Sequence, residues 1–275
     1  MVDLHTHSNV SDGTLAPSEL VARAHAMGVH VLALTDHDEV AGLAPAAQAA
    51  QALGVQLVPG VEISVTWNEL TVHVVGLGID PLNPVLNEGL AHVRSGRQVR
   101  AQRMADALAQ VGIEGALEGA LQWADNPALI SRTHFARWMV HTHRCASVRD
   151  VFGRYLTPGK PGYVPHAWAQ LHEAVGWIGA AGGVAVLAHP GRYALKNNGQ
   201  RRLLTEFRDA GGLAVEVATS NHSPEHVRRF SQLALEYGLE ASRGSDFHRP
   251  HETHAELGRS PALSPSLVPV WRRFI

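Results

Sequence analysis

The chain has 275 residues, a formal net charge of −2 and 45% apolar residues, which is enough for one large α/β domain or for a domain with an insertion. The small net charge excludes the strong positive field of a dedicated duplex-DNA-binding protein, and the single cysteine, Cys145, excludes an internal disulfide framework. Histidine, at 18 residues, is the outlier in composition and indicates metal or proton chemistry.

The first dozen residues carry three side chains of metal-ligand type. A predicted strand over residues 2–4 is followed by His5 and His7, and side chains two apart in a strand point to the same face. Both imidazoles can therefore reach one ion, while the loop of residues 8–13 can bring Asp12 toward a neighbouring ion. A His-x-His pair alone is more often a pair of surface histidines, so the later motifs decide between the two interpretations.

Short apolar strands then alternate with helices. We predict a helix over 16–27, a strand over 31–34, a helix over 42–53, a strand from 55 that leads to Glu62, and a strand over 71–77 that contains His73. The strand over 31–34 is followed by four polar residues, 35–38, which include His37. This alternation is typical of βαβ units in a parallel sheet or barrel, which keep their sites at the carboxyl ends of the strands.

Helical periodicity replaces this rhythm between residues 81 and 163, and we predict an inserted helical cap there. The cap divides a barrel domain into residues 1–80 and 164–275. Its first helix carries a basic stripe, made of Arg94, Arg97, Arg100 and Arg103. A solvated helix face is the commoner meaning of such a stripe, and a surface that faces phosphate or RNA is the alternative.

Two elements outside the barrel strands favour contact with an anion or a nucleotide. Ser131 or Thr133 can cap the next helix, which places Arg132 and His134 at its positive end. Asn221 and His222 follow a strand predicted over 213–217 and are expected on the same side as the site, to meet sugar or base. Loop residues without any ligand contact fit the sequence of that second pair equally well.

The alternation of strands and helices resumes with a predicted strand over residues 183–188, which is followed by His189 and Arg192. We predict helices over 201–210 and 224–237, strands over 213–217 and 239–242, and a short closing helix in the tail. The last strand opens into Asp246 and His248. Acidic residues occupy the positions where a secretory signal would need an apolar run, so we expect a cytoplasmic protein without membrane contact or an implied protein partner.

Nine residues of metal-ligand type collect at the predicted strand ends: His5, His7, Asp12, His37, Glu62, His73, His189, Asp246 and His248. Six imidazoles and three carboxylates suffice for three divalent metal ions per chain with open positions for water and substrate. Ligands of oxygen and imidazole without thiolate favour Mn²⁺, with Fe²⁺ or Zn²⁺ as alternatives.

Five motifs, taken in order, resemble those of the PHP (polymerase and histidinol phosphatase) domain. They are Asp3-Leu4-His5-Thr6-His7-Ser8 with Ser11-Asp12-Gly13, Thr35-Asp36-His37-Asp38, Gly60-Val61-Glu62, Ala188-His189-Pro190 and Gly244-Ser245-Asp246-Phe247-His248. The resemblance implies a distorted (β/α)7 barrel of the PHP type with an inserted helical subdomain, and a trinuclear phosphoesterase site. It assigns one ion to His5, His7, Glu62 and Asp246, a second to Asp12, His37 and His248, and a third to Glu62, His73 and His189.

Within that family the chain is most similar to a small stand-alone branch with an Arg-x-His element, here Arg132 and His134. This implies hydrolysis of the 3'-phosphate of nucleoside 3',5'-bisphosphates, for example adenosine 3',5'-bisphosphate, by a metal-activated hydroxide. Asp246, His134 and Arg132 are the expected catalytic residues. Expected substrate contacts are Arg132, His134, Arg192, Asn221 and His222, and Asp36 and Asp38 are expected to orient His37.

Three alternatives share this sequence pattern. A 5'-3' exoribonuclease would bind short RNA ends and use the basic stripe, and a histidinol phosphate phosphatase would differ only in pocket chemistry. A non-catalytic metal-binding accessory module is the alternative from another class, and the complete ligand set argues against it. The expected partner is a small nucleotide substrate.

Overall fold

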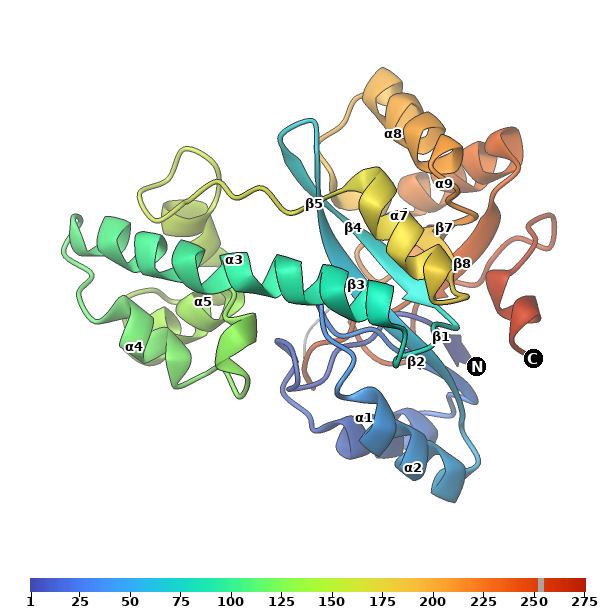
Figure 1. Ribbon diagram of the computed structural model, residues 1–275, viewed down its shortest axis with the longest axis horizontal. Helices are drawn as coiled ribbons and strands as arrows, with labels where there is room; N and C mark the ends of the chain where they lie inside the picture. Colours follow the sequence, from blue (N-terminus) through green and yellow to red (C-terminus); the bar gives the residue numbers. More distant parts are fainter. Residues whose placement is uncertain (252–254) are drawn as a thin grey trace.

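The sheet at the centre of the molecule curls into a nearly closed barrel (Figure 1). The computed structural model describes residues 1–251 and 255–275. Its strands are β1 (Val2–Asp3), β2 (Val31–Leu34), β3 (Gln56–Trp67), β4 (Leu70–Leu77), β5 (Ala169–Gln170), β6 (Val184–Leu187), β7 (Ala214–Thr219) and β8 (Glu240–Gly244). The strand order is β1-β2-β3-β4-β6-β7-β8, with β5 paired to β3. Thr6 pairs with Phe247, and the Leu4 N–H donates to the Arg243 carbonyl at 3.0 Å, so the first and last strands meet. The predicted PHP-type barrel is confirmed.

Strand β4 departs from the expected parallel order. It runs antiparallel to both β3 and β6, whereas β1, β2 and β3 pair in parallel, as do β6, β7 and β8. Asn68 and Glu69 form the connecting turn with φ of 46° and 67°, the left-handed geometry that a two-residue hairpin needs. His73 lies near the start of β4 and pairs with Ser64, so it reaches the same barrel end as the carboxyl ends of the parallel strands.

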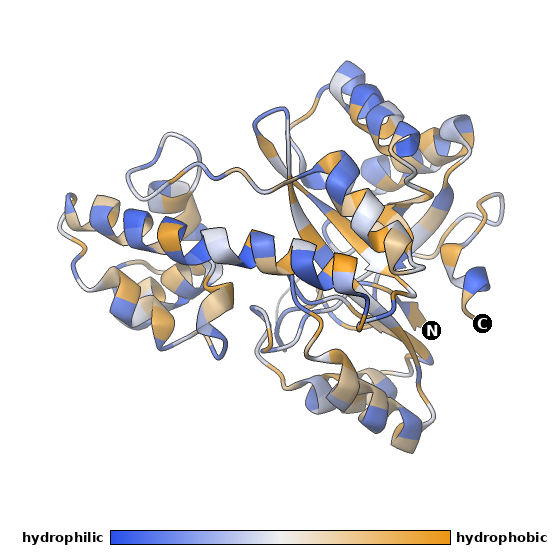
Figure 2. Cartoon of the chain, in the orientation of Figure 1, coloured by the Kyte–Doolittle hydropathy of each residue, from blue (hydrophilic) through white to orange (hydrophobic). Residues whose placement is uncertain are grey.

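Five helices pack around the outside of the barrel: α1 (Pro17–Ala26), α2 (Leu43–Leu53), α7 (Leu171–Ala180), α8 (Asn197–Asp209) and α9 (Pro224–Tyr237). Each turns an apolar face inward, as Phe230, Leu233 and Ala234 do in α9, with the spacing of an amphipathic helix. Figure 2 shows the resulting contrast between apolar strands and helices of mixed hydropathy. The expected closing helix is the 3₁₀ turn η4 (Val270–Arg273).

The barrel strands are buried on both faces, because successive residues enter two different cores. In β2, Leu32 and Leu34 pack under the outer helices, whereas Val31 and Ala33 join a second cluster with Leu4 and residues of the other strands. Burial on both faces explains why the sequences of these strands are continuous runs of apolar residues. The polar residues are therefore left to the strand ends, where the site lies.

The helices between β4 and β5 form a lobe with a core of its own (Figure 1). They are α3 (Pro84–Ala109), α4 (Ala116–Leu121), η1 (Pro127–Leu129), α5 (Arg132–His141), α6 (Val148–Val151) and the π-helical η2 (Phe152–Leu156). Helix α3 begins on the barrel core through Leu86 and Leu90 and ends in the lobe core through Leu108. We keep the division into a cap over 81–163 and a barrel over 1–80 and 164–275 as a proposal.

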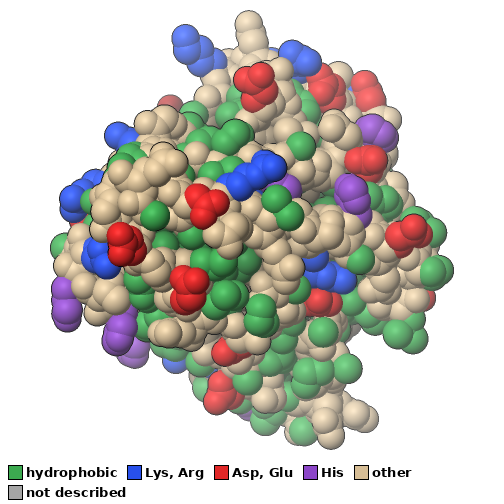
Figure 3. All heavy atoms as spheres, turned by 60° about the vertical axis from the view of Figure 1, so that its left-hand side comes forward, with side chains coloured by type: hydrophobic (Ala, Val, Ile, Leu, Met, Phe, Trp, Pro, Cys, Tyr) green, Lys and Arg blue, Asp and Glu red, His purple; other side chains and the backbone are tan. Residues whose placement is uncertain are grey.

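The surface on the cap side mixes charges of both signs, as Figure 3 shows for the face it presents. This agrees with the net charge of −2. None of the described helices has the length and apolarity needed to cross a membrane.

Candidate metal centre

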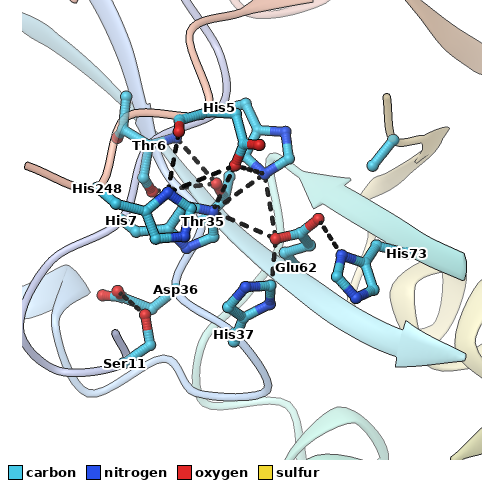
Figure 4. Close-up of polar contacts among 12 residues, drawn as sticks. His5, Thr6, His7, Ser11, Thr35, Asp36, His37, Glu62, His73 and His248 are labelled. Atoms are coloured by element: carbon cyan, nitrogen blue, oxygen red, sulfur yellow. Dashed lines mark hydrogen bonds and ion pairs between the residues drawn. The ribbon is translucent and has the colours of Figure 1, made fainter. Parts of the chain in front are cut away.

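The residues predicted as metal ligands lie together at one end of the barrel, in agreement with their expected place at strand ends. Figure 4 shows most of them converging on Glu62 of β3. His5 and His7 follow β1, His37 follows β2, His73 lies in β4, His189 follows β6, and Asp246 and His248 follow β8. Asp12 enters from the loop after β1, and its Oδ1 lies 3.2 Å from Nε2 of His248.

Glu62 is the centre of the cluster and is fully buried. Its Oε2 lies 3.1 Å from His5 Nε2, 3.2 Å from His7 Nε2 and 3.1 Å from His37 Nδ1. Its Oε1 lies 2.8 Å from His73 Nδ1 and 2.9 Å from His189 Nε2. Burial would raise the pKa of Glu62, but the facing imidazoles, His5 foremost, hold it well below its usual value. The carboxylate is therefore ionised and can bridge two cations.

The ligand atoms fall into three compact groups, within each of which all atoms lie within 4.8 Å of one another. They are His5, His7, Glu62 and Asp246; His7, Asp12, His37 and His248; and His37, Glu62 and His73. The first group equals the first set implied by the family resemblance. The second group adds His7 to the implied set, and the third has His37 where the resemblance implies His189. His189 Nε2 lies 2.9 Å from Glu62 Oε1, and its ring packs against those of His5 and His73.

Unsatisfied polar atoms indicate that the cluster is built for cations. Buried atoms that make no hydrogen bond to any described residue include His7 Nδ1, Asp12 Oδ1, His37 Nδ1, Glu62 Oε2 and His189 Nδ1. Three of these atoms, Asp12 Oδ1, His37 Nδ1 and Glu62 Oε2, face other ligand groups of the cluster. An unpaired buried polar atom costs about 1–3 kcal/mol, so these three need a common explanation. Divalent ions bound by imidazole and carboxylate would supply it, and the residues present fit such ions.

The backbone is strained where three of the strands deliver their side chains. Asp38, His189 and Asp246 have φ of 52°, 27° and 55°, in the left-handed region that non-glycine residues rarely occupy. Such conformations cost about 1–3 kcal/mol each and concentrate at functional sites.

Glu216 of β7 is a site residue that the sequence analysis did not identify. It is 1% exposed, its Oε1 lies 2.8 Å from His5 Nδ1, and its Oε2 accepts a hydrogen bond from the His189 N–H at 2.6 Å. The bond to His5 keeps the proton on Nδ1, which leaves Nε2 free toward Glu62. In the sequence, the indication that Glu216 has a role in the site is that it is a single carboxylate within the otherwise apolar strand predicted over 213–217.

Asp36 and Asp38 do not orient His37 through any hydrogen bond between described residues, contrary to expectation. Asp36 accepts hydrogen bonds from Ser8 and Ser11 at 2.6–2.8 Å and so anchors the loop that carries Asp12. Asp38 accepts from Ser64 and pairs with Arg97 of α3. These two carboxylates fix the walls of the site.

A first cavity of about 170 Å³ opens beside the cluster, between barrel and cap. Arg97, Arg100 and Arg132 line it together with the rings of Phe152 and Trp168. The more common interpretation of the basic stripe, a solvated face, is therefore wrong for Arg97 and Arg100, which are 6% and 9% exposed. Helical periodicity identified the stripe in the sequence. It did not identify Trp168, which follows the cap in the chain and whose ring covers Arg97 and Arg100.

His134, an expected catalytic residue, is 1% exposed and lies at the third position of α5. Its Nδ1 accepts the Ser131 N–H at 3.0 Å in a capping box, so the ring proton is on Nε2. Burial lowers the pKa of His134 to about 4. The ring is thus neutral near pH 7, and His134 is not among the residues that line either cavity beside the cluster.

Of the other expected substrate contacts, Arg192 and Asn221 line a cavity, whereas His222 is buried. Arg192 donates to Asp246 Oδ2 at 2.6 Å and borders the first cavity and a second one of about 560 Å³, which Asn221 also lines. His222 is buried with both ring nitrogens engaged, Nδ1 with the Val217 carbonyl at 2.9 Å and Nε2 with the Gly191 N–H at 3.0 Å. Both ring nitrogens of His222 are thus occupied by backbone groups, and the residue holds the turn that carries Arg192.

Comparisons with known proteins agree with this geometry. The 3',5'-nucleoside bisphosphate phosphatase of Chromobacterium violaceum is 51% identical over 271 residues, which cover 98% of this chain and 95% of that protein. The 5'-3' exoribonuclease Rnm of Escherichia coli is 44% identical over 272 residues, with 98% and 92% covered.

Solved structures support the same relationship. An amidohydrolase from Chromobacterium violaceum, with bound sulfate and no metal, superposes with a TM-score of 0.95 at 50% identity and covers 99% of this chain and 95% of its own. The family model described as PHP domain matches residues 3–220. Motifs, barrel and alignment agree, and the chain belongs to the PHP domain family.

Proposed function

We propose that the protein is a metal-dependent phosphoesterase that removes the 3'-phosphate from nucleoside 3',5'-bisphosphates, for example converting adenosine 3',5'-bisphosphate to AMP and phosphate. The observation that carries the proposal is the Glu62-centred ligand cluster opening into an arginine-lined cavity. The bisphosphate phosphatase relative, at 51% identity over nearly its whole length, supports the substrate class. The chain is a hydrolase of phosphoric esters.

The nine predicted ligands would hold divalent metal ions, up to three per chain, and their donor set favours Mn²⁺ over Fe²⁺ or Zn²⁺. Bound ions supply Lewis acidity, which lowers the pKa of water from 15.7 toward roughly 7 and neutralises phosphate charge. Glu62 and Asp246 are the central carboxylates of this set.

Arginine side chains would orient the phosphate. Arg192 lies against Asp246, and Arg132 lines the same cavity, so both guanidinium groups can contact non-bridging phosphate oxygens. His134, neutral and protonated on Nε2, serves as a hydrogen-bond donor in this proposal. Asn221, at the border of the second cavity, would contact sugar or base in this proposal.

The direct test is phosphate release by Mn²⁺-loaded protein from adenosine 3',5'-bisphosphate, beside histidinol phosphate and a short 5'-phosphorylated RNA. Fast release from the bisphosphate, lost in Asp246→Asn, is the expected result. Faster release from histidinol phosphate would instead make the protein a histidinol phosphate phosphatase. No phosphate release from any of the three substrates, with metal bound, would overturn the proposal.

A second candidate, 5'-3' exoribonuclease activity on short RNA, is favoured by the cavity of about 560 Å³. It shares Phe152, Arg192 and Asp246 with the first cavity and adds Arg149, which is exposed. A phosphodiester at the cluster could therefore extend in two directions. Arg149→Glu should depress RNA cleavage and spare bisphosphate hydrolysis, and equal effects on both would remove this support for RNA.

A further inference from the structure

The backbone ladder between β4 and β6 is interrupted at the residue pair next to the metal centre. The register pairs Val74 with Leu187, so the next pair along these antiparallel strands is His73 with Ala188. The Ala188 N–H donates to the His73 carbonyl at 3.1 Å, which is one of the two hydrogen bonds that such a pair exchanges. The second bond, between the His73 N–H and the Ala188 carbonyl, is replaced by a side chain.

That side chain is Tyr193, which follows the turn η3 (Pro190–Arg192). Its hydroxyl oxygen accepts the His73 N–H at 2.8 Å, and the hydroxyl donates to the Ala188 carbonyl at 2.9 Å. Both backbone groups are satisfied in this way, although the direct bond between them is missing. Because the hydroxyl stands between donor and acceptor, it holds the two strands further apart than a direct bond would.

The interruption lies between two imidazoles that meet the same oxygen of Glu62. His73 Nδ1 lies 2.8 Å from Glu62 Oε1 (Figure 4), and Nε2 of His189, the residue after Ala188, lies 2.9 Å from it. The two rings are 5.2 Å apart and nearly perpendicular. The Tyr193 ring packs edge-on against His189, with 5.6 Å between the ring centroids. One side chain therefore contacts the backbone of one candidate ligand and the ring of the other.

We propose that Tyr193 is a positioning residue for one metal position, formed by Glu62 Oε1, His73 and His189, and that its hydroxyl sets the spacing of the two imidazoles. The inference rests on the metal dependence in the proposed function. The other Glu62 oxygen faces three further imidazoles, those of His5, His7 and His37. The described hydrogen bonds and ring contacts of Tyr193 do not reach these three. Loss of the hydroxyl should therefore affect one ion and spare the others.

The chain offers a matched pair of substitutions. Tyr193→Phe removes the hydroxyl, keeps the ring beside His189 and leaves the two backbone groups unpaired. Tyr237→Phe is the control, because the Tyr237 hydroxyl also donates to a backbone carbonyl, that of Arg201, at 3.3 Å. It joins α9 to α8 on the outside of the barrel, and Tyr237 lines neither cavity beside the cluster.

The first test titrates metal-free protein with Mn²⁺ and follows free Mn²⁺ by electron paramagnetic resonance. Loss of support around a metal ligand typically weakens affinity about 10–100-fold, so Tyr193→Phe should weaken one ion by roughly tenfold or more and leave the others unchanged. Tyr237→Phe should give the wild-type isotherm. Identical isotherms for Tyr193→Phe and the wild type would overturn the assignment. Equal weakening of every ion would also overturn it, because the effect would then be a general loosening of the barrel end.

The second test needs no metal and measures amide hydrogen exchange in the metal-free protein. The His73 amide should exchange roughly tenfold or more faster in Tyr193→Phe, because its acceptor is gone. The amide of Val75, which pairs with Val186 further along the same ladder, should not change. An unchanged exchange rate at His73 would refute the role of the hydroxyl. Neither test uses a substrate, so failure here leaves the proposed phosphatase activity to be decided by phosphate release from the wild type.

Discussion

Replacing Glu216 by Gln should weaken metal binding without disrupting the barrel. The carboxylate accepts two hydrogen bonds, from His5 Nδ1–H at 2.8 Å and from the His189 N–H at 2.6 Å. Burial would raise the pKa of Glu216, but the facing His5 imidazole lowers it, so the group is ionised. A glutamine has one acceptor oxygen and must turn its NH₂ toward one of these donors.

Either orientation has a cost. With the amide oxygen toward His189, the NH₂ faces His5 and moves the ring proton to Nε2, which removes a lone pair from the cluster. With the oxygen toward His5, the NH₂ opposes the His189 N–H, and an unsatisfied buried donor costs about 1–3 kcal/mol. Loss of such support typically weakens metal affinity or activity about 10–100-fold.

The assay is titration of metal-free protein with Mn²⁺, following free Mn²⁺ by electron paramagnetic resonance. Glu206→Gln on α8 is the control, since Glu206 pairs with Arg202 and borders neither cavity beside the cluster. Mn²⁺ affinity in Glu216→Gln within about threefold of the wild type would show that Glu216 supports packing only, and the reasoning on the tautomer of His5 would fail.

Further predictions concern metal, pH and the Arg192 turn. Saturating Mn²⁺ should raise the melting temperature, because binding at 100 times Kd stabilises by about 2.7 kcal/mol, and no rise would contradict a preformed site. The lowered pKa of His134, about 4, means that the unfolded chain takes up a proton first below about pH 6.5, which destabilises the fold by about 3 kcal/mol near pH 4. His134→Gln keeps the capping box and should remove that part of the acid dependence in melting curves. His222→Leu leaves the Gly191 N–H unpaired, so it should cost about 1–3 kcal/mol in denaturant unfolding and raise KM more than Arg103→Gln at an exposed position of α3 does.

The sequence predicted the barrel and the gathering of the candidate ligands at one barrel end, because strand-end residues are set by local order along the chain. Helix α9 runs from Pro224 to Tyr237 as predicted, since proline at its start and Gly238 after its end are local signals. Features that depend on distant packing were not predictable. The covering of Arg100 requires Trp168, and the role of Glu216 requires His5 from the opposite end of the chain.

The separation of charge within the site gives an order of binding that can be measured. The metal side gathers the buried carboxylates Asp12, Glu62 and Asp246, which would repel a phosphate until cations are present. The cap side of the same cavity gathers the guanidinium groups of Arg97, Arg100 and Arg132, whose positive charge favours an anion. Metal-free protein should therefore bind adenosine 5'-monophosphate but gain little from a second phosphate, whereas Mn²⁺-loaded wild-type protein should bind a non-hydrolysable analogue of the 3',5'-bisphosphate more tightly than the monophosphate. Equal preference in both states would mean that the two anion sites are not electrostatically distinct.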